Sequence, residues 1–279
     1  MKFGPPGAIP ELFTADGTIN ELRSRLPQSA TEPIAFVGGS LIDGLGNSTS
    51  DIDVIVLSGD PLNESDLACT VHDEWVSAGD FDVLVSSLGG RRTDVEIRQV
   101  AQIEGIATKL RTDSGRLVDF YLETDILQLL HSMRIGVPIA GAERFTQLRN
   151  GFPWENLSWH LLSRAEAEAA AAVEDAVGAL DAGDHGTALL ASRTAWQAAV
   201  DALLVAAGET NPKSKWRVRK IERSGIPGLM DDYLQWETDP DSSPTALLSR
   251  ARARLYRAQD LLLSAQSEKS GRSGVKGTW

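Results

Sequence analysis

The stretch from residue 36 to residue 57, FVGGSLIDGLGNSTSDIDVIVL, constrains this chain more than any other part of its sequence. Its apolar ends predict two strands, joined by a turn that is rich in glycine and polar residues. Asp51 and Asp53 stand one residue apart in the second strand. Because successive side chains of a strand point to opposite faces, these two carboxylates share one face, while Ile52 and Val54 take the other.

The residue types in this stretch suit phosphate and metal chemistry. Two carboxylates inside an apolar strand repel each other unless a cation or solvent lies between them. Mg²⁺ prefers hard oxygen ligands and is commonly bound by one or two carboxylates together with substrate phosphates. In the Gly38-Gly39-Ser40 corner, glycine lets a phosphate approach backbone N–H groups, and the serine hydroxyl can donate to it. The stretch therefore predicts a magnesium site beside a phosphate cradle.

A plainer interpretation of the same residues is an ordinary loop followed by an edge strand with solvated charges. That interpretation accounts for an Asp-x-Asp pair alone. It does not account for charged side chains in an apolar strand that follows a glycine corner, where burial without a partner is costly.

The first half of the chain predicts a small α+β domain around this stretch. Strands are expected at 81–86 and 93–99, joined by a tight turn at Gly89-Gly90. Asp94 and Glu96 share one face of the returning strand, so either could lie beside Asp51 and Asp53. The remaining apolar spacing predicts short helices at 9–26, 64–78, 100–110 and 126–134, and a short apolar segment containing Asp119 at 116–122.

The composition shifts near residue 150, beyond which the chain is rich in alanine and loses its strand patterns. Helical spacing there predicts an antiparallel bundle, with helices at 154–182, 185–207, 213–223, 229–236 and 245–267. We therefore expect an α+β protein, in which a mixed-sheet domain over 1–150 precedes an all-α helical bundle over 151–268. The polar residues 269–279 predict a disordered tail.

Charge and cysteine content narrow the classes of function. A formal net charge of −12 argues against a general nucleic-acid binder and favours a small cationic substrate. Cys69 is the single cysteine, which excludes a disulfide within the chain or a thiolate zinc cluster and suggests a reducing compartment. No apolar run reaches transmembrane length, so we expect a soluble cytoplasmic protein with no membrane partner.

The motif Gly39-Ser40, followed by Gly44 and then by Ser50-Asp51-Ile52-Asp53-Val54, is similar to the signature of the DNA polymerase β superfamily of nucleotidyltransferases. The resemblance directly covers residues 36–57, and the predicted hairpin supplies a later strand in the expected order. The helical half looks like the bundle that accompanies small-substrate members, including antibiotic adenylyltransferases, on architecture alone.

The resemblance implies roles for individual residues. Gly39 and Ser40 would hold the β- and γ-phosphates of a nucleoside triphosphate, with Gly38 and Ser50 beside them. Two Mg²⁺ ions would be bound by Asp51 and Asp53. Asp94 would be the third carboxylate, which binds the catalytic metal or accepts the proton of the attacking hydroxyl, and Glu96 is the alternative for that role. Asp119 is a weaker candidate.

Three other features of the sequence bear on such a site. Asp43 departs from the family pattern, since many minimal members have a basic or neutral residue before the glycine. Lys215 and Arg219 share a face of an expected helix and would clamp the triphosphate. Alternatively, they belong to a basic helix face that is simply exposed to solvent. The four histidines have no metal-ligand spacing, so each is expected at the surface or satisfied in the core.

The reaction implied is metal-dependent transfer of a nucleoside monophosphate, AMP from ATP, to a hydroxyl of a small molecule, with release of pyrophosphate. The acceptor class would be an antibiotic-like compound or a biosynthetic intermediate. Two alternatives remain open at this point: nucleotidylation of tRNA or a protein, and a regulatory protein with a degenerate nucleotide site.

Overall fold

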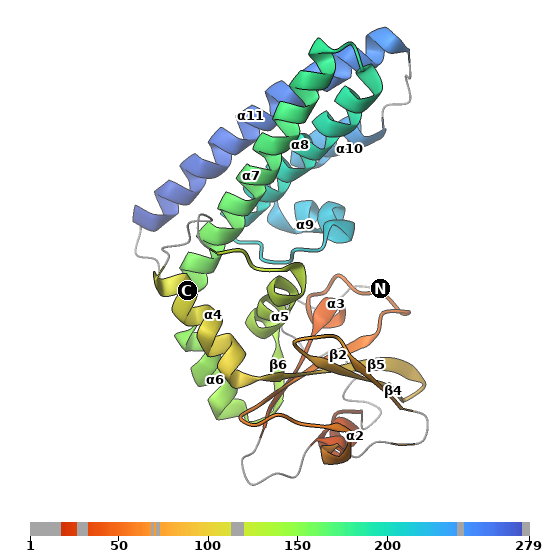
Figure 1. Cartoon of the computed structure of the whole chain (residues 1–279), viewed down its shortest axis with the longest axis vertical. Helices are drawn as coiled ribbons and strands as arrows, with labels where there is room; N and C mark the ends of the chain where they lie inside the picture. The colour runs from red at the N-terminus through yellow and green to blue at the C-terminus, as the bar shows by residue number, and fades with distance from the viewer. Residues whose placement is uncertain are drawn as a thin grey trace. The chain divides into compact units, whose positions relative to one another are not determined.

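The chain forms two compact units. They are seen in a computed structural model that describes residues 18–26, 33–67, 70, 73–112, 120–238 and 243–274. Unit 1 holds the described residues of Met1–Thr112 and Leu122–Pro153, and unit 2 holds those of Asp113–Tyr121 and Trp154–Trp279. Unit 1 combines a sheet with helices, while the described part of unit 2 shows helices and no strand (Figure 1). The expected α+β class is confirmed.

Unit 1 is built on a six-stranded mixed sheet in the order β3-β4-β5-β2-β1-β6. Neighbouring strands pair antiparallel except β2 and β5, which run parallel. Their bounds are β1 (Ile34–Gly38), β2 (Ile52–Ser58), β3 (Glu74–Ser77), β4 (Asp82–Leu88), β5 (Arg91–Gln99) and β6 (Val137–Ala140). The two strands that carry the candidate carboxylates are therefore direct neighbours in the middle of the sheet.

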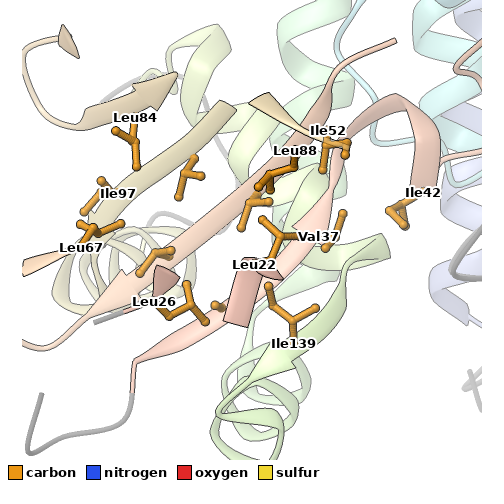
Figure 2. Close-up of a cluster of buried hydrophobic side chains, with 14 of the residues drawn as sticks. Leu22, Leu26, Val37, Ile42, Ile52, Leu67, Leu84, Leu88, Ile97 and Ile139 are labelled. Atoms are coloured by element: carbon orange, nitrogen blue, oxygen red, sulfur yellow. The ribbon is translucent and has the colours of Figure 1, made fainter. Parts of the chain in front are cut away.

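Helices cover both faces of this sheet (Figure 1). They are α2 (Thr18–Arg25), α3 (Gly39–Ile42), α4 (Val100–Thr112), α5 (Thr124–Ile135) and α6 (Ala142–Gly151), with a 3₁₀ turn η1 (Glu64–Asp66). On one face, Leu22 of α2 and Leu26, just after it, join a buried cluster with side chains of the strands (Figure 2). On the other face, Phe36 of β1 packs against Phe145 of α6, with ring centroids 4.7 Å apart. The apolar residues of β1 and β2 thus anchor the strands that lead to the site.

Unit 1 differs from the prediction at its two short edge strands, β3 and β6. The helix predicted over 64–78 is wrong. In the described part of this range, the 3₁₀ turn η1 is followed by β3, and Asn63 caps η1 by accepting from Ser65 N at 3.0 Å. The strand β6 and the helix α6 were not predicted, because Gly136 and Pro138 are typical of a helix end. Pro138 is tolerated in β6 because this strand lies at the sheet edge.

Unit 2 consists of helices whose long members pack through small side chains. Its elements are α7 (Trp154–Asp181), α8 (His185–Ala206), η2 (Ser214–Trp216), α9 (Arg217–Ser224), α10 (Leu229–Thr238) and α11 (Pro244–Gly274). The helix α8 contacts both α7 and α11, and Ala172, Ala176 and Ala195 form a buried cluster with Leu255. Within the described residues, none of the helices has the length and apolar character needed to span a membrane.

The helix α11 extends into the tail that was predicted to be disordered. Disorder was expected from residue 269, but the helix continues to Gly274. Lys269 is buried there, and its Nζ donates to Ser158 Oγ of α7 at 2.8 Å. A polar composition suggested disorder, yet this lysine is held against α7 by a specific hydrogen bond. Residues 275–279, the predicted segment at 116–119 and the predicted helix over 9–17 lie outside the described residues.

Candidate active site

The glycine corner lies directly against one of the candidate carboxylates. Gly38 ends β1 and is the Cα partner of Asp53 in β2. Gly39 has a φ of 71°, and a Cβ added to it would lie 1.7 Å from Asp53 Oδ2. A side chain at Gly39 would therefore be strained by the backbone and would also occupy the place of the Asp53 carboxylate.

The loop after the corner is closed by its own backbone. The carbonyl of Ser40 accepts hydrogen bonds from Leu45 N at 3.0 Å and from Gly46 N at 2.7 Å. Further along, Ser50 Oγ accepts from Asn47 N at 2.9 Å, and the Ser50 carbonyl accepts from Arg91 Nη1 at 2.7 Å. Ser50 thus shapes the turn into β2, while the Ser40 side chain stays half-buried at the corner.

The parallel pairing of β2 with β5 brings two candidate carboxylates side by side. Asp53 is the Cα partner of Asp94, although the two residues come from different hairpins. Their neighbours Val54 and Val95 are buried on the opposite face, so alternation directs Asp53 and Asp94 to the same face. Asp51 stands just before β2, and its side chain is 46% exposed.

Arg92 lies among these carboxylates. Its Nε donates to Asp94 Oδ1 at 2.9 Å, and its Nη2 donates to Asp94 Oδ2 at 3.2 Å. The same Nε is 4.0 Å from Asp51 Oδ2. The hydrogen bonds and the charge of Asp94, with a smaller contribution from Asp51, raise the pKa of Arg92 above its ordinary value. A positive charge therefore already links two of the three candidate carboxylates.

Glu96, the alternative third carboxylate, is engaged elsewhere. It is the Cα partner of Ile55 and is hydrogen-bonded by Arg98 Nε. The Arg98 side chain is fully buried, contacts Asp125 Oδ2 at 3.1 Å, and stacks 3.9 Å from the centroid of the Phe81 ring. Glu96 is thus part of a network that holds α5 to β5, whereas Asp94 faces Asp53.

Asp43 and His131 form a buried contact directly behind the glycine corner. His131 Nε2 of α5 lies 3.0 Å from Asp43 Oδ2, and both residues are less than a tenth exposed. Asp43 N also donates to the Gly39 carbonyl at 3.0 Å. The next residue of α5, Ser132, would meet a Cβ on Gly38 at 2.7 Å. The helix α5 therefore supports the corner at two points, and His131 is satisfied in the core, as expected.

Lys215 and Arg219 belong to unit 2 and do not share one helix. Lys215 lies in η2, 5.0 Å from the Trp216 ring centroid, while Arg219 lies in α9 and is 3.6 Å from Glu222. The expected continuous helix over 213–223 is wrong: the 3₁₀ turn η2 ends at Trp216, and α9 begins at Arg217. Arg217, the first residue of α9, is buried. Burial alone would lower the pKa of Arg217, but its hydrogen bonds to Asp201 outweigh this effect and raise the pKa. A role for Lys215 and Arg219 toward triphosphate stays a prediction.

The candidate carboxylates fit a hard divalent cation by their chemistry. Among the described side chains, no group of three or more His, Cys, Asp or Glu residues is arranged to hold a metal ion. Asp51 and Asp94 both lie next to a cation, the Arg92 guanidinium, and Asp53 is the register partner of Asp94. Carboxylate oxygens are the hard ligands that Mg²⁺ takes. By donor type alone, Asp51, Asp53 and Asp94 are the residues that would hold it.

Comparisons with known proteins identify a fold likeness only. No family model matches the chain, and no curated protein matches it significantly. Among solved structures, it is similar to the crystal structure of a nucleotidyltransferase-like protein from Exiguobacterium sibiricum. The identity is 13%, the TM-score is 0.48, and the alignment covers 96% of this chain and 81% of that one.

Sequence reasoning did not find the two pairings around the corner. The hydrogen bonds between Arg92 and Asp94 were not predicted. The spacing Arg92-x-Asp94 on one strand carried the missing signal, because residues two apart in a strand share a face. Asp43 and His131 are 88 positions apart, and no local pattern links them.

A Gly39→Ala variant should lose activity and stability together. The left-handed backbone costs about 1–2 kcal/mol for a non-glycine residue, and the new methyl would displace the Asp53 carboxylate. We expect a fall of several degrees in the thermal midpoint of unfolding and loss of turnover. Gly59→Ala is the matched control, since a Cβ there meets nothing within 4 Å. If Gly39→Ala binds nucleotide as tightly as wild type, the phosphate-binding role predicted for the corner is wrong.

Proposed function

We propose that this chain is a metal-dependent nucleotidyltransferase that moves AMP from ATP to a hydroxyl group of a small molecule. The observation that carries the proposal is the packing of the Gly39-Ser40 corner on Asp53, with Asp94 in register on the neighbouring parallel strand. One unit thus supplies a backbone surface for phosphate and adjacent carboxylates for a metal.

The proposed roles follow from the chemistry of each group. Backbone N–H groups at Gly39 and the Ser40 hydroxyl would bind the terminal phosphates of the triphosphate. Bound divalent ions would neutralise the charge of the triphosphate and of pyrophosphate. Asp51 and Asp53 would hold those ions, and the register of Asp94 with Asp53 favours Asp94 over Glu96 as the third carboxylate.

The reaction itself is an in-line displacement. The acceptor hydroxyl oxygen forms a bond to the α-phosphorus, the bond from that phosphorus to the bridging oxygen breaks, and pyrophosphate leaves with the electron pair. The hydroxyl proton passes to a carboxylate, for which Asp94 is the proposed acceptor. Most of the rate gain would come from positioning and from charge stabilisation.

The acceptor is proposed to be small and cationic. The net charge of −12 attracts a cation and repels a polyanion such as tRNA, although salt weakens both effects. An aminoglycoside-like compound, with several hydroxyl and ammonium groups, has the right chemistry.

The direct test is a screen of the four nucleoside triphosphates against a library of small hydroxyl compounds, with pyrophosphate release as the readout. We expect Mg²⁺-dependent release with ATP and a cationic acceptor, and none with EDTA. If transfer occurs only when tRNA or a protein is added, the acceptor is that macromolecule and not a small molecule. A degenerate regulatory protein is favoured instead if saturating Mg²⁺ and a nonhydrolysable ATP analogue do not raise the thermal midpoint of unfolding.

A further inference from the structure

Arg92 occupies the place between two carboxylates that the proposed function assigns to metal binding. We propose that Arg92 is an internal counter-ion, which competes with a divalent metal for Asp94 and so weakens metal binding in the absence of nucleotide. This inference rests on the proposed function, because it concerns the same carboxylates.

The geometry of the contact uses both oxygens of Asp94. Arg92 Nε and Nη2 donate to Oδ1 and Oδ2 at 2.9 and 3.2 Å, in the two-pronged arrangement that is typical of strong guanidinium-carboxylate pairs. The third contact, 4.0 Å from Nε to Asp51 Oδ2, is longer and electrostatic. These hydrogen bonds occupy one lone pair on each oxygen, and the charge of the guanidinium repels a metal ion that approaches the same carboxylate.

The charges explain why a guanidinium is placed here. Asp51, Asp53 and Asp94 together carry three negative charges, and Arg92 offsets one of them. Without it, mutual repulsion would destabilise the ionised carboxylates. The Arg92 side chain is 58% exposed, so it can leave Asp94 for solvent without breaking a core contact. An incoming metal therefore competes with an exposed cation that can move into solvent, rather than with a buried one.

The competition has a consequence for the order of binding. A triphosphate offers the displaced planar guanidinium a new anionic partner. Metal and triphosphate would then bind with positive coupling, since each binds better once Arg92 has left Asp94. Free metal ions alone would be bound weakly.

The test is a titration of the full chain with Mn²⁺ alone, in which free Mn²⁺ is measured by electron paramagnetic resonance. Mn²⁺ takes the same hard oxygen ligands as Mg²⁺. Since exposed ion pairs are worth up to about 1 kcal/mol, Arg92→Gln should bind Mn²⁺ about twofold to fivefold more tightly than wild type. Arg92→Lys should fall between them. Lys109→Gln removes the same charge from the exposed last turn of α4 and should stay within about twofold of wild type by screening.

The outcomes separate this inference from the proposed function. Tighter binding in Arg92→Gln that is lost again on adding Asp51→Asn supports both. Equal Mn²⁺ affinity in wild type and Arg92→Gln, at a site that Asp51→Asn destroys, overturns the role of Arg92 and leaves the metal site intact. An equal gain in Lys109→Gln also overturns it, because net charge would be the cause. No Mn²⁺ binding by any variant overturns both. Structural damage cannot imitate the expected result, since it does not raise affinity.

Discussion

An Asp53→Asn variant should lose nucleotidyl transfer almost completely while it keeps its fold. The amide has the shape of the carboxylate, so the contact with Gly39 is retained. It lacks the charge that a divalent ion needs, and loss of several kcal/mol of charge stabilisation corresponds to a decrease of about 10³-fold or more in kcat. Asp51→Asn should behave in the same way. Pyrophosphate release under saturating ATP and acceptor is the measurement.

Two controls show whether the loss is specific to these carboxylates and whether the variants keep their fold. Asp60→Asn changes an exposed carboxylate just beyond the other end of β2 and should keep wild-type turnover. Thermal midpoints of the Asp53 and Asp51 variants should lie at or above that of wild type, because each substitution removes repulsion within the carboxylate group. Full turnover in both variants would remove the basis of the proposed function.

The second large effect is expected at the buried contact between Asp43 and His131. Leaving a buried polar group without its hydrogen-bond partner costs about 1–3 kcal/mol, because that group keeps its desolvation penalty. Asp43→Ala should therefore lower the thermal midpoint of unfolding by about 2–12 °C in a domain of this size. Nucleotide affinity should fall as well, because Asp43 N holds the Gly39 carbonyl within the corner.

A double-mutant cycle tests whether the two residues act as a pair. His131→Ala should cost a similar amount, and the double variant should lose less stability than the sum of the single variants. We expect a coupling free energy of about 1–3 kcal/mol from denaturant unfolding. Additive losses would mean that Asp43 and His131 stabilise the corner through separate neighbours.

Local periodicity was enough to predict the parts of the site that lie within one strand. Alternation along 51–54 placed Asp51 and Asp53 on one face, and the 2% and 1% exposure of Ile52 and Val54 on the other face agrees with it. The hairpin of β4 and β5 is confirmed as well, because a glycine pair between alternating segments is a strong local signal.

Relations between distant strands and helices could not be predicted in this way. Sequence patterns left Asp94 and Glu96 equivalent, since both point to the same face of β5. Only the register with β2 and the buried position of Arg98 separate them. Edge strands were missed for a related reason: β3 and β6 gain their order from pairing with a neighbour, which their own short sequences do not encode.

The parallel pairing of β2 with β5 also has a consequence for the order of folding. The connection over residues 59–90 includes β3 and β4, so Asp94 can reach Asp53 only after a long loop has closed. Antiparallel β4 and β5 meet through a tight turn, and such local contacts form sooner than parallel pairings that are distant in sequence. A chain that is still emerging from the ribosome would hold Asp51 and Asp53 without their third neighbour. We therefore expect the three carboxylates to come together late in folding.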